Sequence, residues 1–323
     1  MSVLYKLISP QEFITLLKAQ QAKQLGAAKR IIPVDATWYL PNANRNAKEE
    51  FLTQERIPGS IFFDIDSIKD TESPYPHMAP PAHKFAEAMN QFGVLPNDVL
   101  VVYDRIGNFS SPRCAWTLAL FGHPEVYLLN NFTEYQKLNG PIETSSVDKL
   151  SPYTPTNNYN INKDISEEQV VKYDEMMELV QSKHFHDGKI QLFDARSNGR
   201  FKGVDSEPRP GLSSGHVPGA QSLPFVDVLD PVTKQFPTDS KDMKNIIIEA
   251  IRKNNGNTKS KEDVERDLEN NQIYTMCGTG VTGAIIKTAF EHAGYKNIKL
   301  YDGSWTEWAL RNGDDSSLII KDL

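Results

Sequence analysis

The segment from Ile273 to Phe290 combines a cysteine with a glycine-rich loop between an apolar strand and a helix. Cys277 opens this loop, which reads Cys-Gly-Thr-Gly-Val-Thr-Gly, and apolar residues at helical spacing follow it. Its glycines permit backbone conformations that turn successive N–H groups toward one point. Those donors and the helix N-terminus favour negative charge near the sulfur, and the thiolate is the nucleophilic form of cysteine. The pattern predicts a reactive thiol; the alternative is a structural cysteine buried at a strand end.

Composition narrows the classes of protein that this chain represents. The 323 residues include 35 basic and 42 acidic side chains, a net charge of −7 with no long basic tract, so we expect no direct binding of nucleic acid. No apolar run approaches the length of a membrane span, so we expect no membrane partner. Two cysteines make neither a disulfide framework nor a structural zinc site. The prediction therefore includes no metal and no cofactor.

The N-terminal region and the cysteine content bear on location. Two cysteines fit a reducing compartment, and the N-terminus lacks the apolar core of a signal peptide. Residues 13–34 carry basic and no acidic side chains, which fits an ordinary amphipathic helix and leaves a mitochondrial address open. The expected location is cytoplasmic, mitochondrial or both.

The two halves of the chain repeat one pattern of alternating strands and helices. Strands are expected at 31–35, 99–104 and 126–129, and again at 190–194, 273–276 and 298–301. Capping boxes at Ser9–Glu12 and Ser166–Gln169 predict helices that run to about Leu25 and Ser182. An Ile-Pro-Gly turn ends at Gly59, 24 residues after Asp35, and a Val-Pro-Gly turn ends at Gly219, 25 residues after Asp194. The repeat predicts an internal duplication of an α/β unit.

This duplication gives the expected domain organisation. The fold class is α/β, with two tandem domains, each a small parallel sheet flanked by helices on both faces. Residues 1–138 form the first domain and 164–323 the second, joined by a linker at 139–163 that is rich in Pro, Ser, Thr and Asn. A polar stretch at 252–271 is expected to be a surface insertion.

The first half provides an internal comparison for the cysteine loop. The equivalent segment begins at Asp104 and contains no cysteine, while Cys114 lies in an apolar helix where a packed thiol is expected. Only the second half should therefore carry the nucleophile, with the first half contributing to a cleft between the domains.

The tandem units, the two Pro-Gly turns and the Cys-Gly-Thr-Gly-Val-Thr loop together resemble the two-domain rhodanese-type sulfurtransferases. The resemblance extends from about Tyr5 to Asn312. Thiosulfate sulfurtransferases of this family carry basic residues directly after the cysteine, whereas Gly278 and Thr279 are uncharged, as in the mercaptopyruvate branch. A thiosulfate dianion favours fixed positive charge beside the sulfur, while a neutral loop suits a donor whose carboxylate lies several atoms away. The resemblance thus implies 3-mercaptopyruvate as the better donor and thiosulfate as the poorer one.

The resemblance also implies roles for residues outside the cysteine. Two arginines of the family bind the substrate carboxylate, and they match Arg200 and Arg209; a bidentate guanidinium suits that task. An acid–base set matches Asp66, His77 and Thr279, with threonine where the family has serine. The substrate-binding positions of the loop match the residues Gly278, Gly280, Val281 and Thr282. At the helix start Gly283 replaces the usual alanine.

The implied reaction passes through a persulfide on Cys277 and releases pyruvate. The persulfide sulfur would then move to cyanide, to a thiol such as thioredoxin, or to a protein acceptor. Some relatives feed tRNA thiolation through rhodanese-type relay proteins, and any such role here would use a protein acceptor.

Two alternatives come from other classes of protein. A Cys-loop phosphatase also places cysteine between strand and helix, but it needs an arginine at the position of Gly283 to clamp phosphate. A persulfide carrier of the same fold with little small-molecule turnover would transfer sulfur between proteins without releasing pyruvate.

Overall fold

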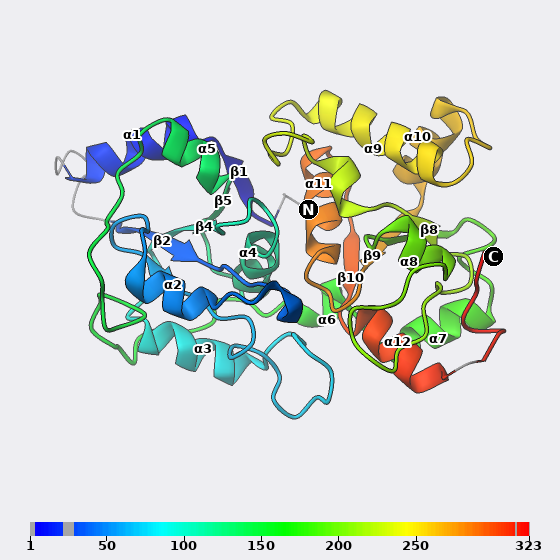
Figure 1. Ribbon diagram of the computed structural model, residues 1–323, viewed down its shortest axis with the longest axis horizontal. Coiled ribbons are helices and arrows are strands. Elements are labelled where there is room, and N and C mark those ends of the chain that lie inside the picture. The colour runs from blue at the N-terminus through cyan, green and yellow to red at the C-terminus, as the bar shows by residue number, and fades with distance from the viewer. Residues whose placement is uncertain (1–3, 22–28, 314, 323) are drawn as a thin grey trace.

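The computed structural model describes residues 4–21, 29–313 and 315–322, which form two domains of the same architecture (Figure 1). The elements of the N-terminal domain are, in chain order, β1 (Lys6–Ile8), α1 (Pro10–Gln21), β2 (Ile31–Asp35), η1 (Pro41–Ala43), α2 (Ala47–Thr53), β3 (Ile61–Phe62), α3 (Ala82–Gln91), β4 (Val99–Tyr103), α4 (Ser111–Leu120), β5 (Val126–Leu129) and α5 (Phe132–Lys137). Those of the C-terminal domain are α6 (Ser166–Gln169), β6 (Val170–Val171), α7 (Tyr173–Gln181), β7 (Ile190–Asp194), α8 (Asn198–Lys202), β8 (Gln221–Ser222), η2 (Phe225–Val228), α9 (Ser240–Asn254), α10 (Lys261–Asn270), β9 (Gln272–Met276), α11 (Gly283–His292), β10 (Ile298–Tyr301) and α12 (Ser304–Asn312).

Both sheets are parallel and share one strand order, which confirms the predicted α/β fold and its duplication. The orders are β1-β5-β4-β2-β3 and β6-β10-β9-β7-β8. In the second sheet β7 pairs with β9 up to Asp194↔Met276, so Cys277 follows directly at the carboxyl edge. In the first sheet β2 pairs with β4 up to Asp35↔Tyr103, which places Asp104 at the equivalent position. Because all strands are parallel, the loops that bear functional groups gather at one edge of each sheet.

Side chains of the central strands alternate between two apolar cores. In β4, Val99, Val101 and Tyr103 pack with residues of α1 and α5, while Leu100 and Val102 point to the face covered by α3 and α4. This second core continues without interruption into the C-terminal domain, where it includes residues of α9, α10 and α11. Since α4 contacts α11 directly, the domains share a packed interface and form one body.

The two predicted capping boxes had different outcomes. At Ser9 the expected reciprocal pair forms: the Glu12 carboxylate accepts from the Ser9 N–H at 2.9 Å, and the Ser9 hydroxyl accepts from the Glu12 N–H at 3.3 Å. The predicted end of that helix near Leu25 lies outside the described residues. At Ser166 the prediction of one long helix was wrong, because its N–H and hydroxyl donate to Asp164. The helix stops after one turn, and Val170–Val171 pairs with β10 as an edge strand.

The segments predicted as linker and insertion are both well packed. Residues 139–163 run along the N-terminal domain, where the Leu150 carbonyl accepts from the Phe62 N–H at 2.8 Å and the Ser151 hydroxyl donates to the Phe92 carbonyl. The polar stretch at 252–271 contains the end of α9 and an amphipathic helix, α10, whose Val264 and Leu268 are buried. High charge therefore did not prevent this stretch from folding against α9.

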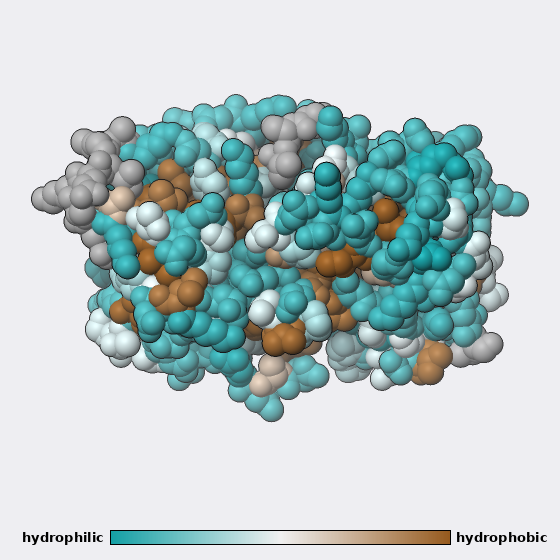
Figure 2. All heavy atoms as spheres, turned by 90° about the horizontal axis from the view of Figure 1, so that it is seen from above, coloured by the Kyte–Doolittle hydropathy of each residue, from teal (hydrophilic) through white to brown (hydrophobic). Residues whose placement is uncertain are grey.

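The face of the molecule seen from above the view of Figure 1 is mainly polar. Figure 2, seen from above the view of Figure 1, shows hydrophobic residues only as small separate groups on that face. Within the described ranges, none of the helices is both long and apolar enough to cross a membrane.

Candidate active site

Cys277 lies at the carboxyl end of β9, and the start of α12 holds its backbone. The Cys277 N–H donates to the Ser304 hydroxyl at 3.1 Å, and its carbonyl accepts from the Trp305 N–H at 2.9 Å. The next carbonyl, that of Gly278, accepts from both the N–H and the hydroxyl of Thr306. Cys277 is 2% exposed. The sulfur therefore lies on a fixed loop, shielded from bulk solvent.

The loop after Cys277 presents a row of backbone donors. Among the described residues we find no protein acceptor for the N–H groups of residues 278–282. Gly280 adopts φ +79°, a conformation that other residues rarely accept, and a side chain there would meet Arg113 and Asp302. Buried N–H groups are almost always paired, so five consecutive free donors indicate a site for an anion or a polarised sulfur.

The equivalent loop of the N-terminal domain is closed on its own carboxylate. Asp104 accepts hydrogen bonds from the backbone N–H groups and hydroxyl of five loop residues, Ile106, Gly107, Phe109, Ser110 and Ser111. Asp104 is itself buried, at the position that Cys277 occupies in the other domain. An internal anion thus fills the first loop, whereas the second leaves its donors free. Cys114 lies fully buried in α4, and burial raises the pKa of its thiol well above the ordinary value.

A hydrogen-bonded chain joins the two domains beside the cysteine loop. His77 Nδ1 lies 2.9 Å from the Thr279 hydroxyl, and His77 Nε2 lies 2.9 Å from Asp66 Oδ1. The second oxygen of Asp66 accepts from the Trp38 indole N–H at 2.8 Å. A carboxylate only accepts, so Nε2 carries the proton, and Nδ1 of the neutral ring can accept from Thr279. Thr279 lies 202 positions after His77 in the sequence. The structure therefore brings together residues from distant parts of the chain.

Burial and the neighbouring Asp66 carboxylate shift the pKa of His77 in opposite directions. Burial lowers the pKa of the imidazole, while the hydrogen bond to Asp66 raises it. In return, the hydrogen bond from His77 lowers the pKa of Asp66. The ring is therefore held largely neutral near pH 7, the form that can take up a proton.

Arg200 is held by a buried network behind the cysteine loop. Its guanidinium donates to both oxygens of Glu207, the nearer contact being 2.5 Å, and one side-chain nitrogen lies against Gly278. Glu207 also pairs at 2.7 Å with Arg196, which is fully buried and bonded to Asp194. The loop itself is uncharged, yet Arg200 brings positive charge next to it from another element. The absence of charge at positions 278 and 279 alone therefore does not decide between donors.

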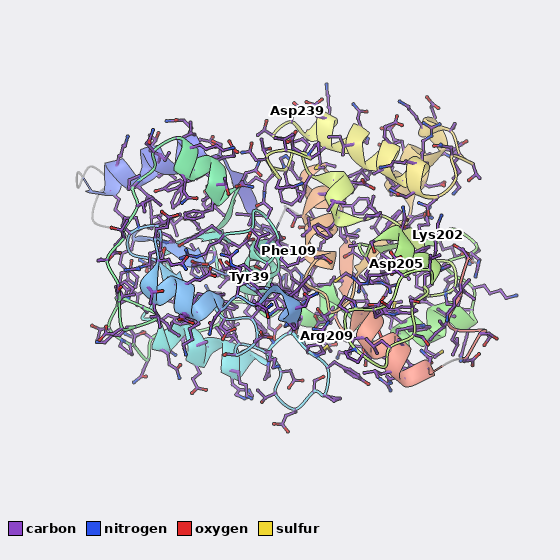
Figure 3. The ribbon with its side chains drawn as sticks, viewed as in Figure 1. Tyr39, Phe109, Lys202, Asp205, Arg209 and Asp239 are labelled. Carbon is purple, nitrogen blue, oxygen red and sulfur yellow. The ribbon has the colours of Figure 1, made fainter. Side chains whose placement is uncertain are left out.

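Arg209 contributes a second cation where the two domains meet (Figure 3). Partial burial lowers the pKa of its guanidinium, and the proximity of Cys277 opposes that shift. Within the part of the chain that is described, no hydrogen bond or ion pair to Arg209 is found. Arg209 thus faces the region of Cys277 with its donors available for an anionic group.

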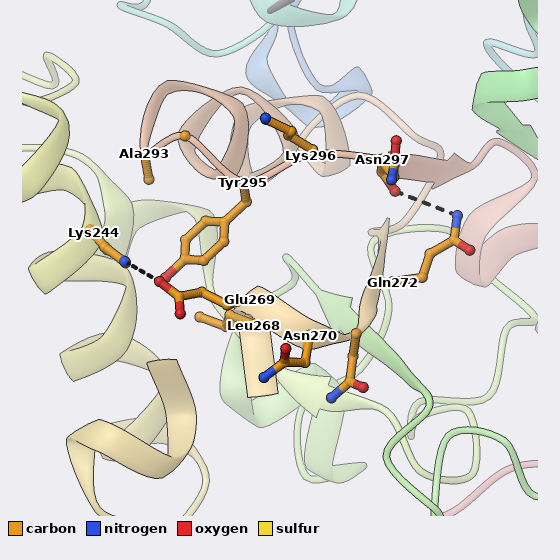
Figure 4. A pocket seen from close by; sticks show the side chains of 11 residues that line it. Lys244, Leu268, Glu269, Asn270, Gln272, Ala293, Tyr295, Lys296 and Asn297 are labelled. Carbon is orange, nitrogen blue, oxygen red and sulfur yellow. Dashed lines mark hydrogen bonds and ion pairs between the residues drawn. The ribbon is translucent and has the colours of Figure 1, made fainter. Parts of the chain in front are cut away.

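Two further cavities have linings that do not include Cys277. One of about 470 Å³ is lined by Lys244, Glu269, Gln272, Tyr295 and neighbouring residues (Figure 4). It lies at the amino ends of β9 and β10, the opposite edge of the sheet from Cys277. A smaller one of about 230 Å³ adjoins Asp66 and Trp38 on the N-terminal domain.

A thiol at the carboxyl end of a parallel strand, followed by free backbone donors in one of two duplicated α/β domains, defines a class of sulfur-handling proteins. A family model described as "Rhodanese-like domain" matches residues 18–136 and again 180–311. The chain belongs to the two-domain sulfurtransferases of the thiosulfate/3-mercaptopyruvate type, which confirms the resemblance seen in the sequence.

Individual relatives match nearly the whole chain. A Saccharomyces cerevisiae protein named "Thiosulfate sulfurtransferase TUM1" is 47% identical over 97% of each chain, and a Schizosaccharomyces pombe protein named "Probable 3-mercaptopyruvate sulfurtransferase" is 34% identical over 95% and 96%. The crystal structure of Tum1 from S. cerevisiae superposes with a TM-score of 0.89 and 46% identity, covering 99% of both chains. A sulfur transferase subunit of yeast mitochondrial complex I gives a TM-score of 0.79 and 34% identity, covering 98% of this chain and 100% of that one.

The structure brings most of the predicted site residues together, whereas several residues that support them were not predicted. Asp66, His77, Thr279 and Cys277 form one connected site, with Arg200 and Arg209 nearby. Three supporting residues were not predicted from the sequence: Arg113, Arg196 and Glu207. Charged residues in apolar surroundings, such as Arg113 in Pro-Arg-Cys-Ala-Trp, are the signal that identifies such supports.

Proposed function

We propose that this protein transfers sulfur from 3-mercaptopyruvate, and less well from thiosulfate, through a persulfide on Cys277. The observation that carries the proposal is the row of five free N–H donors beside a shielded cysteine, since the homologous loop is filled by Asp104. In this proposal residues 278, 280, 281 and 282 bind the reacting sulfur through their backbone, and Arg200 and Arg209 bind the donor carboxylate. Phosphate chemistry is disfavoured because the loop itself carries no arginine.

In the first half-reaction the Cys277 thiolate attacks the sulfur of 3-mercaptopyruvate. A new S–S bond forms, the C–S bond breaks, and its electron pair leaves as the enolate of pyruvate. Protonation of that enolate gives pyruvate. In this proposal the proton comes from the thiol of bound 3-mercaptopyruvate: neutral His77 takes it up at Nδ1 through the Thr279 hydroxyl, and the resulting imidazolium, stabilised by Asp66, returns it to the enolate by the same route.

In the second half-reaction an acceptor thiol or cyanide attacks the outer persulfide sulfur and restores the Cys277 thiolate. Thioredoxin and a rhodanese-type relay protein are the acceptors we propose, the latter as a route to tRNA thiolation without direct contact to nucleic acid. We further propose a cytoplasmic, a mitochondrial or a dual location; one structural relative is described as a sulfur transferase subunit of yeast mitochondrial complex I, which supports a protein partner and the mitochondrial location.

Two measurements test the proposal. Treatment with 3-mercaptopyruvate should add about 32 Da, one sulfur, to the peptide that contains Cys277. Steady-state kinetics with both donors should give the higher kcat/KM for 3-mercaptopyruvate. Cys114→Ser serves as the matched control, since that thiol is buried in α4. Normal pyruvate release by Cys277→Ser contradicts the mechanism.

A persulfide carrier with little turnover is the second candidate, favoured by the shielding of Cys277. It predicts persulfide exchange with a partner protein but no pyruvate release. The same two measurements therefore separate the candidates.

A further inference from the structure

The His77 backbone has an unfavourable conformation that needs support. Its φ is +61°, in the left-handed region that non-glycine residues rarely occupy. Such a conformation is energetically unfavourable and persists only where surrounding contacts enforce it. The contacts at His77 and Ala79 that enforce it come from Arg113 and Asp302.

Arg113, on α4, reaches from the N-terminal domain into the cysteine loop. One terminal nitrogen donates to the His77 carbonyl, and the other lies 3.5 Å from the Gly280 carbonyl and 2.6 Å from Asp302 Oδ1. The Trp116 ring packs against the guanidinium at 4.5 Å. The side chains of Arg113 and Asp302 are 3% and 2% exposed, so the charges are buried.

Asp302 completes the connection from the C-terminal domain. Its second oxygen accepts from the Ala79 N–H at 2.6 Å, two residues after His77. It lies at the end of β10, two residues before Ser304, whose hydroxyl accepts from the Cys277 N–H. Among the salt bridges between described residues, Arg113–Asp302 is the one that joins the two domains.

We propose that Arg113 and Asp302 are positioning residues, whose buried ion pair holds the His77–Ala79 segment against the cysteine loop and so keeps His77 Nδ1 within hydrogen-bond distance of Thr279. This inference rests on the proposed function, since it gives the pair a purpose in catalysis. The pair contacts the backbone at His77, Ala79 and Gly280, and the charge of Arg113 also lowers the pKa of the His77 ring. Gly280 is glycine for the same reason: a Cβ there would lie 2.8 Å from the Arg113 guanidinium.

The test compares Arg113→Lys and Asp302→Asn with Arg56→Lys. Arg56 is a matched control, because it is equally buried, donates to the backbone carbonyls of Phe51 and Ser145, and lies within the N-terminal domain. Lysine keeps the charge of Arg113 but cannot reach three partners, and asparagine at 302 keeps an acceptor for Ala79 while removing the ion pair. We expect kcat for pyruvate release to fall at least tenfold in both site variants, with KM changed less than threefold and Arg56→Lys unchanged in kcat.

A second readout follows the geometry directly. Ring ¹⁵N signals of His77, identified by their loss in His77→Asn, should shift in Arg113→Lys and Asp302→Asn but not in Arg56→Lys, because the hydrogen bond to Thr279 changes. A kcat within twofold of normal together with unmoved His77 signals overturns the inference. If the unmodified protein forms no persulfide with 3-mercaptopyruvate, the proposed function fails instead, and the ring signals still report whether the pair positions His77. Should Arg113→Lys not fold, Asp302→Asn alone decides.

Discussion

Replacing Asp104 with asparagine tests why only one of the duplicated loops offers free donors. Asp104 Oδ1 accepts from two backbone N–H groups, at Ile106 and Gly107. Oδ2 accepts from three backbone N–H groups and one hydroxyl, all within residues 109–111. Asparagine has the same size but keeps a single acceptor oxygen. Its NH₂ group must therefore face donors in either orientation.

The expected loss of stability follows from the orientation that costs less. With the amide oxygen at the Oδ2 position, the N–H groups of Ile106 and Gly107 lose their acceptor. A buried donor without an acceptor costs about 1–3 kcal/mol; the Gly107 N–H is buried while that of Ile106 is partly exposed, so Asp104→Asn should lower the free energy of unfolding by at least about 1–3 kcal/mol. The loss of charge from the remaining bonds acts in the same direction.

Urea unfolding followed by tryptophan fluorescence measures this change. The control is Asp230→Asn, where a surface carboxylate accepts from the N–H groups of Val232 and Thr233; its unfolding curve should stay close to that of the unsubstituted protein. The slope of the free energy against urea should be the same in all three proteins, so that the midpoint reports stability. An Asp104→Asn midpoint equal to that of the control refutes the view that Asp104 satisfies this loop.

Three further predictions concern the site and the buried histidines. Thr279→Val removes the hydroxyl that faces His77 and should lower kcat for pyruvate release about 10²-fold or more, while Thr279→Ser keeps it; steady-state kinetics checks both. Glu207→Gln frees Arg200 from its anchor and should raise KM for 3-mercaptopyruvate about tenfold, with no change in the rate of Cys277 alkylation. Burial lowers the pKa of His123 below its ordinary value of about 6.5, so the unfolded chain binds its proton first and this contribution to stability is lost as the pH falls below that value. Urea unfolding at pH 7 and pH 5 should therefore show a smaller loss of stability for His123→Gln than for the unsubstituted protein.

The sequence predicted elements with strong local signals and failed where pairing is set at a distance. The central strands 99–103 and 272–276 are apolar runs of the expected length, and both were recognised. The edge strand Val170–Val171 exists only because β10 lies beside it, so helical periodicity in residues 166–182 gave a wrong result there. Residues 139–163 likewise pack through hydrogen bonds to distant parts of the N-terminal domain and through Tyr159, which lies in the core; their composition does not reveal these contacts.

The difference between local signals and distant contacts also applies to the candidate site and the residues that support it. Cys277 and its glycines form a contiguous motif, so their chemistry is visible in one segment of sequence. His77 has no local signal and Arg113 has only its charge in apolar surroundings, because their roles depend on contacts between the two domains. In the N-terminal domain the loop donors are bonded to Asp104. The same domain supplies Asp66 and His77 to the cysteine loop of the other domain. Docking of the domains and assembly of the site are therefore one event, and substitutions that loosen the α4–α11 interface should reduce turnover before they unfold either domain.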